Sequence, residues 1–514
     1  MNLAGTIAEM LVYGEIEGRE ELERVKRRLA RKFKCKMPKN SEILRAIPED
    51  EREKFRDILV KKPSRTLSGV SVIAVMTSPH PCPHGTCLYC PGGVKKGVPQ
   101  SYTGREPASM RAAQNNYDPY LQVKSRLEAL REIGHPTDKI DLIIMGGTFP
   151  ARDKKYQEWF VKRCFDALNG IEGKTLEEAH RINETAENRC IGLTVETRPD
   201  YFTEEEVDFS LYLGATRVEL GVQILDDYVL SKVKRGHGVK EVVEATRIAK
   251  DSGFKVCYHI MPGLPYSSEA NDLEKFKMIF EDERFRPDML KIYPTLVVEG
   301  SELYDMWKAG EYEPLNVDNA IKLVAEMKRH VPEYVRIQRV QRDIPSYMIS
   351  AGVKKGDLRE RVRKYMEERG WRCRCIRCRE VGRRKVGEIN PEILVREYRA
   401  SLGKEIFISY EDAEKDVVVG YVRLRFPSDM AHRPEVRESA IVREIKVFGK
   451  EMRIGEHGNA WQHKGVGKKL MQEAEHMARS EGFSRVLVIS GVGAREYFRK
   501  MGYCRLGPYM AKRI

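Results

Sequence analysis

Three closely spaced cysteines could hold a metal centre. Cys82, Cys87 and Cys90 have four and then two residues between them, in a Pro- and Gly-rich loop after the β-branched run 70–75. Cysteine thiolates at short spacings hold iron–sulfur clusters. Three such ligands leave one iron of a 4Fe–4S cluster open to an exogenous ligand, as a redox enzyme requires. A zinc site completed by a nearby histidine fits the same spacing, and a chance grouping is the remaining alternative.

A second group of thiols lies far along the chain. Cys373, Cys375 and Cys378 fall within six residues, inside the strongly basic stretch 354–385. This spacing predicts a structural zinc site whose fourth ligand comes from elsewhere. The neighbouring arginines favour the thiolate, which is the form that binds metal. A redox-active or unoccupied thiol cluster is the alternative.

A glycine-rich turn near the C-terminus could bind an anion. Gln462-His-Lys-Gly465-Val-Gly467 precedes a predicted helix from Lys468 to about Glu481. Backbone N–H groups at a helix N-terminus point at a bound anion, and the helix dipole favours a pyrophosphate there. Because glycine-rich turns before helices are common, the turn alone is a weak signal.

Alternating strands and helices must position the first cysteine group. Between about residues 66 and 342, short apolar runs alternate with amphipathic helix-length segments such as 119–133, 203–213 and 239–252. This order predicts repeated βα units and a parallel sheet, as a doubly wound sheet or an incomplete barrel. In both forms, ligands bind at the C-terminal ends of the strands. The six predicted strands are 70–76, 140–145, 190–195, 217–222, 255–260 and 289–293.

Glycine and polar residues follow several of these strands. Gly146-Gly147-Thr148 follows the second strand, Glu196 and Arg198 follow the third, and Gln223 ends the fourth. A plain turn or a structural ion pair explains each feature singly. Together at one sheet edge they favour a small-ligand site, because glycines let a ligand approach the backbone. Glu196 and Arg198 offer charges for an amino-acid zwitterion and a ribose.

The segment from about residue 390 to the C-terminus predicts a second α/β unit. Antiparallel strands are expected at 406–409, 417–425 and 440–448, before the glycine-rich turn and its helix. A further strand at 485–490 and a helix at 494–501 complete the unit.

Charge indicates a polyanionic partner. The 514 residues carry a formal charge of +14, with 91 basic and 77 acidic side chains. Eight of the thirteen residues in 24–36 are Lys or Arg, whereas Leu22, Val25, Leu29 and Phe33 fall on one helical face. The basic residues can therefore neutralise phosphates with little base preference. A solvated helix face and a membrane-surface helix are the alternatives.

The bulk composition excludes several classes of protein. No run of 18 apolar residues predicts a transmembrane helix, and the first 19 residues lack the order of a signal peptide. Eleven cysteines, an odd number, argue against a secreted disulfide scaffold and for the reducing cytoplasm.

Longer motifs carry a resemblance to a known family. Residues 70–345 resemble a radical S-adenosylmethionine (SAM) domain, in which Gly146-Gly147-Thr148 matches the site for the methionine amino group. The superfamily's commonest cysteine spacing has three residues in the first gap, and this chain has four. More specific strings are similar to the family of Elongator catalytic subunits in its archaeal or bacterial form. They are Cys90-Pro-Gly-Gly, Ser101-Tyr-Thr-Gly-Arg-Glu-Pro, Met145-Gly-Gly-Thr-Phe149, Glu196-Thr-Arg-Pro-Asp200 and Val340-Gln-Arg-Asp-Ile344.

The resemblance implies cofactors and their ligands. It implies a 4Fe–4S cluster on Cys82, Cys87 and Cys90, with SAM beside it. The C-terminal unit resembles a GNAT acetyltransferase, whose glycine-rich turn binds the pyrophosphate of acetyl-CoA. Such proteins usually carry two tyrosines near the thioester, and Phe498 replaces the second. The expected SAM residues are Gly146, Gly147, Thr148, Glu196, Arg198 and Gln223. The expected acetyl-CoA residues are Lys139, Glu444, Ile445, Lys446, Val447, Gln462, Gly465, Val466, Gly467, Lys468, Tyr497 and Phe498, with Tyr497 also expected to be catalytic.

The resemblance also implies an activity. A SAM-derived radical would act on acetyl-CoA to install a carboxymethyl group on C5 of wobble uridine 34 of a tRNA. A protein lysine acetyltransferase with a structural cluster is the runner-up, and a tRNA-binding module with vestigial chemistry is the third reading. We expect an electron donor, a cytoplasmic location and no accessory subunits, with the chain a monomer or homodimer. The residues expected to contact the tRNA anticodon stem-loop are Lys26, Arg27, Arg28, Arg31 and Lys32.

Four domains are therefore expected. Residues 1–62 form a basic helical segment that binds tRNA, and residues 63–350 form a partial (βα)6 radical SAM barrel. Residues 351–389 form a basic zinc-binding linker. Residues 390–514 form a mixed α/β GNAT domain.

Overall fold

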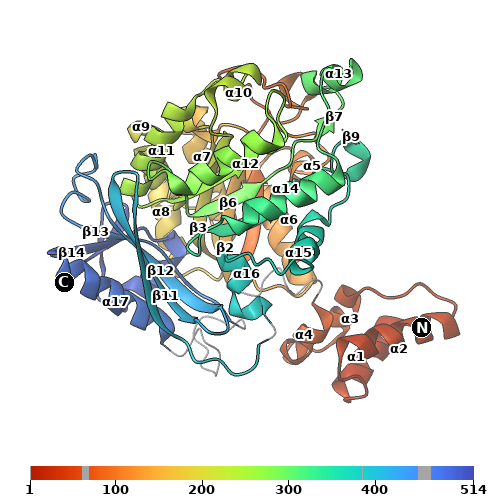
Figure 1. Cartoon of the computed structure of the whole chain (residues 1–514). Helices are drawn as coiled ribbons and strands as arrows, with labels where there is room; N and C mark the ends of the chain where they lie inside the picture. Colours follow the sequence, from red (N-terminus) through yellow and green to blue (C-terminus); the bar gives the residue numbers. More distant parts are fainter. Residues whose placement is uncertain (1, 61–68, 385, 450–464) are drawn as a thin grey trace.

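A parallel sheet of seven strands carries the first cysteine loop (Figure 1). The computed structural model describes residues 2–60, 69–384, 386–449 and 465–514. The sheet order is β1-β2-β3-β4-β5-β6-β8, and β1 and β8 are its two edges, so the described strands form an open partial barrel. The strands are β1 (Ser71–Met76), β2 (Lys139–Met145), β3 (Arg189–Thr197), β4 (Arg217–Gln223), β5 (Lys255–Ile260), β6 (Met289–Ile292) and β8 (Arg336–Val340).

The predicted α/β class is confirmed, and the sheet has one strand more than expected. All six predicted strands are present as β1 to β6. The seventh, β8, was missed because its sequence Arg-Ile-Gln-Arg-Val contains no apolar run. Ile337 and Val340 are buried, whereas Arg339 is exposed and is in register with Lys291 of β6. One face of β8 therefore packs into the core while the other stays polar.

Helices cover the outer face of this sheet (Figure 1). Their apolar faces pack on the outward-pointing side chains of the strands in one core that includes Ile73, Ile144, Phe160 and Val195. Among the described helices, none is long and apolar enough to cross a membrane. The helices are α5 (Pro107–Gln114), α6 (Pro119–Glu132), α7 (Lys154–Asn169), α8 (Leu176–Asn183), α9 (Glu204–Tyr212), α10 (Asp227–Lys232), α11 (Val239–Asp251), α12 (Glu269–Glu281), α13 (Glu302–Lys308), α14 (Val317–Arg329) and α15 (Leu358–Glu367).

A mixed seven-stranded sheet forms the C-terminal domain. Among its described strands, only β13 and β14 pair in parallel, and every other neighbouring pair is antiparallel. Helix α17 (Val466–Ser480) packs its buried face on this sheet, and the short α18 (Arg495–Arg499) follows β14. In order, the strands are β10 (Glu392–Ala400), β11 (Gly403–Asp412), β12 (Val417–Phe426), β13 (Ala440–Val447), β14 (Arg485–Val488), β16 (Tyr509–Arg513) and β15 (Cys504–Leu506).

The two central strands of this sheet separate along their length. The β13–β14 register covers only residues 440–442 of β13. Beyond it, residues 444–446 pair with β12 on one side and have no β14 partner on the other. This edge exposes backbone N–H and C=O groups that an extended ligand can use.

Short helices at the N-terminus form a separate small core. The helices α1 (Leu3–Val12), α2 (Arg19–Lys32), α3 (Asn40–Ala46) and α4 (Arg56–Leu59) lie beside the barrel (Figure 1). Ile7, Leu22 and Ile43 are fully buried in this core.

The barrel and the C-terminal domain share a core. Ile441 and Leu487 belong to the same buried cluster as the barrel residues. At Gly491 a β-carbon would lie 2.1 Å from the carbonyl oxygen of Ile191, so only glycine allows this approach. The short helix α16 (Ile376–Arg379) links the two parts, because it contacts both β8 and β12.

Candidate active site

The first cysteine loop lies at the C-terminal end of β1. Two turns shape it, in which the Gly85 N–H donates to the Cys82 carbonyl and the Cys90 N–H donates to the Cys87 carbonyl, each at 3.0 Å. The Leu88 N–H donates to the Val233 carbonyl at 3.2 Å and ties the loop to the segment after β4. The loop therefore holds its three thiols at the mouth of the barrel.

Hydrogen-bond donors surround these sulfurs. Gln100 Nε2 and the Ser101 N–H lie 3.0 and 3.2 Å from Cys90 Sγ, and Arg235 Nη1 lies 3.8 Å from Cys87 Sγ. Burial raises the pKa values of the Cys82 and Cys87 thiols, while Arg235 opposes this effect at both. Donors aimed at sulfur stabilise metal-bound thiolates, so the loop fits a thiolate-held metal centre.

Sulfur spacing separates the two metal interpretations. A zinc–sulfur bond of about 2.3 Å keeps two thiolates on one zinc within about 4.6 Å of each other. The sulfurs of Cys373, Cys375 and Cys378 all lie within 4.8 Å of one another, whereas those of the first loop do not. The first loop therefore fits a larger cluster, and the second group fits a single ion.

The glycine pair after β2 faces the cysteine loop. Gly146 and Gly147 have φ values of +123° and +102°, which favour glycine. A β-carbon on Gly146 would lie 2.3 Å from Thr77 Oγ1, and one on Gly147 would lie 3.8 Å from Cys82 Sγ. Thr148 Oγ1 is 3.9 Å from the same sulfur. This turn leaves its backbone open beside the cysteines.

A cavity of about 230 Å³ fills the interior of the barrel. Its lining includes Cys82, Gly147 and Thr148. It also includes the predicted SAM residues Glu196, Arg198 and Gln223. Glu196 accepts from the Tyr102 hydroxyl at 3.2 Å and from Lys291 Nζ at 3.4 Å. Arg198 forms a bidentate pair with Asp200 at 2.9 and 2.6 Å, which leaves Nη1 as its unbonded donor. Gln223 has a φ of +69° and an unbonded amide oxygen.

Several cavity residues were not found from the sequence. Lys291 and His259 both contact Glu219, with a His259 Nε2–Glu219 Oε2 distance of 2.8 Å. Arg217 lies 3.5 Å from the other carboxylate oxygen. Glu219, Cys257 and His259 have ligand atoms within 4.8 Å of one another, but the two cations on Glu219 disfavour a metal ion there. One sequence signal could have found these residues. They are charged or polar side chains inside strands that were predicted to be buried.

The predicted anion turn begins α17. Gly465 has a φ of +72°, and the helix starts at Val466, so its first N–H groups point out of the turn. Lys468 is exposed in the first turn of this helix. Gln462 lies outside the described residues.

Tyr497 and Phe498 lie differently on α18. Tyr497 is 45% exposed, and its hydroxyl lies beside the start of α17. Phe498 is buried in the core, with its ring centroid 5.3 Å from that of Tyr497 and 6.0 Å from that of Tyr503. The buried ring of Phe498 therefore packs against the ring of Tyr497 on its core side. Lys139, at the start of β2, is 3.8 Å from Asp138 and lies at the opposite end of the barrel from the cysteines.

Gly467→Ala is expected to weaken coenzyme A binding about tenfold, equivalent to about 1.4 kcal/mol. A β-carbon there would lie 2.5 Å from Tyr497 Oη, so the tyrosine must move. Alanine favours a helix over glycine, so the thermal stability should not fall. Calorimetric titration with coenzyme A measures the effect. Gly356→Ala, at a position with open space, is the control, and equal affinity of both variants would contradict the prediction.

The second cysteine group lies between the two domains. Cys375 directly precedes α16 and Cys378 lies within it. The Ile376 N–H donates to the Val335 carbonyl at 2.9 Å. Hydrogen bonds from Cys373 and Cys378 hold the pKa of Cys375 well below its usual value. Such a shared thiolate fits a metal ion.

The basic face of α2 contains most of the predicted tRNA residues. Arg27, Arg28, Arg31 and Lys32 are exposed. Lys26 is a correction, because it is only 4% exposed and its ammonium bonds to Glu23 Oε1 at 3.0 Å and Asn40 Oδ1 at 2.6 Å. Its charge is already used inside the N-terminal core.

Matches with known proteins decide the family. Residues 1–67 match the ELP3 N-terminal domain, 78–276 the radical SAM superfamily, 287–368 the radical SAM C-terminal domain and 377–503 the acetyltransferase (GNAT) family. The tRNA uridine(34) acetyltransferase of Methanocaldococcus jannaschii is 54% identical over 488 residues, covering 92% of this chain and 90% of that protein. The chain belongs to the Elongator complex protein 3 family.

Other members of the Elongator complex protein 3 family agree over nearly the full length. The human Elongator complex protein 3 is 42% identical over 527 residues, covering 99% of this chain and 96% of that protein. The solved archaeal Elp3 of Methanocaldococcus infernus, with an N-terminal deletion, superposes with a TM-score of 0.78 at 48% identity. It covers 87% of this chain and 100% of that structure. The chain is thus an enzyme with radical SAM and acetyltransferase domains.

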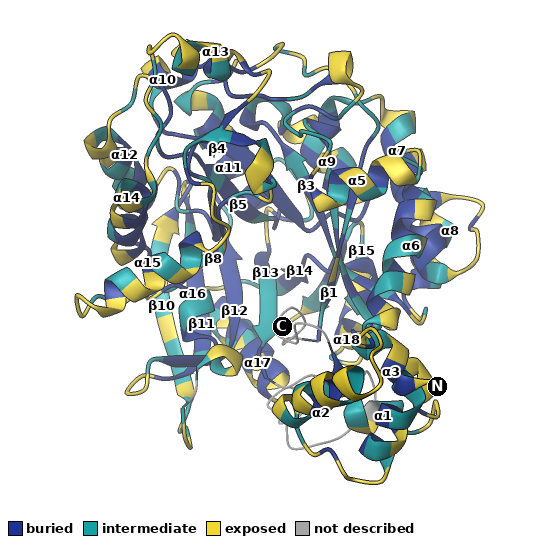
Figure 2. Ribbon diagram, turned by 90° about the vertical axis from the view of Figure 1, so that its right-hand side faces the viewer, coloured by how far each residue is buried: buried dark blue, intermediate teal, exposed yellow. Residues whose placement is uncertain are grey.

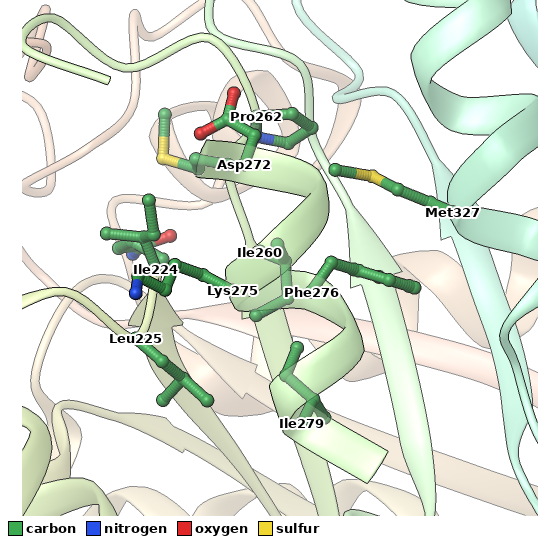
Figure 3. Close-up of a pocket in the computed structure, with 11 residues that line it drawn as sticks. Ile224, Leu225, Ile260, Pro262, Asp272, Lys275, Phe276, Ile279 and Met327 are labelled. Carbon is green, nitrogen blue, oxygen red and sulfur yellow. The ribbon is translucent and has the colours of Figure 1, made fainter. Parts of the chain in front are cut away.

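A second, small cavity adjoins this Elongator-type site, because Gln223 and Met261 line both. It measures about 10 Å³ and lies between the ends of β4 and β5 and the helices α12 and α14 (Figure 3). Asp272 of α12 borders it and accepts from the Gly263 N–H and the Ser267 hydroxyl, each at 2.6 Å. Burial raises the pKa of Asp272 to about 6 despite these bonds.

Asp272→Asn is expected to stabilise the protein more at pH 7 than at pH 4.5. The folded state holds the proton of Asp272 more tightly than the unfolded chain, so its contribution to stability falls as pH rises from about 4 to 6. The amide oxygen can still accept from the Gly263 N–H, and the amide nitrogen can donate to the Ser267 hydroxyl. The change therefore removes the charge, which relieves on the order of 2 kcal/mol above pH 6. Melting temperatures across this range measure it, with the exposed Asp429→Asn as control. A difference that does not vary with pH would contradict the assignment.

Proposed function

We propose that this protein installs a carboxymethyl group on C5 of uridine 34 in the tRNA anticodon, using SAM and acetyl-CoA. One observation carries the proposal. The cysteine loop lies at one end of the barrel cavity, and the acetyltransferase domain packs against the other end of the same barrel. The relatives named tRNA uridine(34) acetyltransferase support tRNA as the substrate.

The barrel residues would hold the radical cofactors. Cys82, Cys87 and Cys90 fit a 4Fe–4S cluster, because Gln100, Ser101 and Arg235 direct donors at their sulfurs. A reduced cluster held there with SAM would supply radical chemistry for the acetyl group. The turn Gly146-Gly147-Thr148 would present backbone groups to the methionine end of SAM. Glu196, Arg198 and Gln223 line the same cavity and would orient the remainder.

The C-terminal residues would hold acetyl-CoA. The edge of residues 444–446, which the β14 register does not cover, can bind the amides of the pantetheine arm. The N-terminus of α17 from Gly465 to Lys468 can bind the pyrophosphate. Tyr497 is exposed beside this helix and is the one proposed catalytic side chain of the domain. Lys139 lies at the barrel end that packs against the acetyltransferase domain. It remains a proposed acetyl-CoA contact.

The second cysteine group would hold one structural zinc ion. Cys373, Cys375 and Cys378 supply three thiolates with the required spacing. Among the described residues no fourth His, Cys, Asp or Glu ligand completes this group. A zinc here would fix α16, which joins the barrel to the acetyltransferase sheet.

Charge reversal at Arg27 and Arg28 is expected to weaken tRNA binding at least about tenfold and to flatten its salt dependence. Both side chains are exposed on α2 and are free to neutralise phosphates. Electrophoretic titration at two salt concentrations measures the effect. Lys174→Glu, exposed on the outer side of the barrel, is the control. Lys26→Gln should lower stability and leave tRNA affinity unchanged, and an unaltered titration of the Arg27 and Arg28 variant would remove α2 from the proposed tRNA surface.

An anaerobic assay with tRNA, SAM, a reductant and acetyl-CoA tests the proposed function. Nucleoside mass analysis should show carboxymethyluridine only when all four are present. Acetylation of protein lysines without SAM turnover would support the acetyltransferase alternative instead. We infer that a cytoplasmic electron donor serves the reductant's role and that the chain acts as a monomer or homodimer.

A further inference from the structure

Arg235 is a buried cation beside the first cysteine loop. Its side chain is 8% exposed, and its backbone N–H donates to the Leu230 carbonyl of α10 at 2.9 Å. Arg235 Nη1 lies 3.8 Å from Cys87 Sγ. The Leu88 N–H donates to the Val233 carbonyl, so the segment that carries the arginine is tied to the cysteine loop. These bonds fix the guanidinium relative to the sulfur.

A glycine in the middle of β4 makes room for this guanidinium. All of β4 is buried in the interior of the barrel domain (Figure 2). The Gly221 carbonyl accepts from Arg235 Nη2 at 2.7 Å and from Nε at 3.2 Å. A β-carbon on Gly221 would lie 2.4 Å from Nη2, which is closer than a side chain allows. Glycine inside a strand often marks such a close approach, so β4 is shaped to hold this arginine.

The charge of Arg235 lacks a carboxylate partner within the part of the chain that the structure describes. Eight described arginines are buried, and each of the other seven pairs with Asp or Glu, as Arg217 does with Asp141 and Arg495 with Glu184. A buried charge is costly unless an anion neutralises it. The partners of Arg235 are a carbonyl and a sulfur, so the thiolates of the cysteine loop are the anions left to it.

The carboxylate of bound SAM is a less suitable counter-ion for Arg235. Arg235 lines the barrel cavity, but all of its guanidinium nitrogens already have partners. Arg198 lines the same cavity and keeps Nη1 unbonded. Arg198 can therefore meet an anionic ligand, whereas Arg235 is directed at the sulfur.

We propose that Arg235 is the buried counter-cation of the radical cluster and that its charge makes the cluster easier to reduce. The inference rests on the proposed function in taking the bound metal centre to be a 4Fe–4S cluster. Three thiolates make such a cluster anionic, and reduction adds further negative charge. Because water screens little in this buried site, the Arg235 cation stabilises the reduced state more than the oxidised one. Arg235 acts through the sulfur ligands and is a positioning residue.

A potentiometric titration of the reconstituted full chain tests this proposal. Arg235→Gln removes the charge and keeps an amide donor for the Gly221 carbonyl. Arg217→Gln is the matched control, because Arg217 is also 8% exposed but lies 3.1 Å from the Asp141 carboxylate. Electron paramagnetic resonance of the reduced cluster, recorded without SAM at a series of poised potentials, measures the midpoint.

We expect the ratio of reduced to oxidised cluster at a given potential to fall at least about tenfold in Arg235→Gln. This change equals a midpoint lower by about 59 mV for one electron. Arg235→Lys keeps the charge as an ammonium and should recover at least about half of the shift. Arg217→Gln should stay within about twofold of wild type. An unshifted midpoint in Arg235→Gln, or an equal shift in Arg217→Gln, would overturn the proposal.

Iron content and melting temperature decide the case in which a variant binds the cluster poorly. The rise in melting temperature on reconstitution should be smaller in Arg235→Gln than in wild type, because the cluster then binds without its counter-cation. Loss of iron from Arg235→Gln alone would support the proposal. Equal loss from Arg235→Lys would overturn it, since lysine keeps the charge. An unchanged midpoint with weaker SAM binding would overturn it in favour of a SAM contact.

The same samples separate this proposal from the proposed function. If the midpoint shifts as expected but wild type forms no carboxymethyluridine, the proposed function fails and the role of Arg235 stands. If wild type forms carboxymethyluridine and the midpoint does not shift, only the role of Arg235 fails. If wild type binds no 4Fe–4S cluster, both fail.

Discussion

Replacing Cys87 by alanine is expected to abolish SAM cleavage and to leave tRNA binding unchanged. Cys87 is 6% exposed, and its sulfur has Arg235 as a donor at 3.8 Å and His84 Nε2 at 3.2 Å. With two of the three proposed thiolates left, the cluster loses a ligand in a site that offers no described substitute cysteine nearby. Iron content per chain and 5′-deoxyadenosine formation measure the first effect, and tRNA titration measures the second.

A matched cysteine separates loss of the cluster from loss of the fold. Cys164→Ala makes the same change at a fully buried position in the core of the same domain. It should lower stability slightly through a small cavity and keep both iron and SAM cleavage. If Cys87→Ala still forms 5′-deoxyadenosine, the loop is not the cluster site. If Cys164→Ala loses iron equally, the assay reports folding and the ligand assignment loses its support.

The barrel strands were predictable because of how they are buried. Strands covered on both faces read as apolar runs, as in β2 and β5. Strand β8 has only one apolar face, since Arg339 points away from the core, and no run marks it. The cysteine loop and the glycine turn were found because their chemistry depends on short spacing within a single segment.

The charged interior could not be predicted in the same way. Glu219, His259 and Lys291 come from three strands, and each is a single polar residue in its segment. Sheet register brings them together, because His259 is opposite Lys291 and Glu219 is opposite Cys257. A one-residue change in register would reverse these faces, so only the assembled sheet defines the group.

Two smaller differences follow from helix geometry. Lys26 lies four residues after the buried Leu22, so it falls at the border of the apolar face and turns inward to Asn40. Tyr497 and Phe498 are adjacent on the five-residue α18, so the two rings point to different sides. In both cases, the number of residues between the side chain and a buried neighbour on the same helix could have predicted which way it points.

Arg443→Met is expected to lower the free energy of unfolding by about 3–5 kcal/mol, because it leaves buried carboxylates without a partner. Arg443 Nη2 lies 2.6 Å from both Asp288 Oδ1 and Glu405 Oε2, and all three side chains are at most 1% exposed. Lys250 is 3.6 Å from Asp288 and 3.3 Å from Glu405, and it alone cannot replace the lost bidentate contacts. Chemical and thermal unfolding measure the loss.

The stability deficit of Arg443→Met should depend on pH. Burial would raise the pKa of Asp288, but Arg443, Lys250 and Arg423 outweigh it and hold that pKa well below its usual value. The wild-type contribution is therefore present above the usual carboxyl range and is lost as pH falls. Without Arg443 the carboxyl groups take up protons more readily, so the deficit of the variant should be largest near pH 7 and should shrink toward pH 5.

A surface arginine provides the matched control for this ion-pair network. Arg363 of α15 contacts Glu360 and Glu367 with all three side chains more than half exposed, so Arg363→Met should cost less than about 0.5 kcal/mol. Asp288 and Glu405 belong to different domains, so Arg443→Met should also increase hydrogen exchange at both Phe254 and β13. If the two variants unfold alike, the buried charges contribute little, and the shared apolar core around Ile441 and Leu487 holds the domains together.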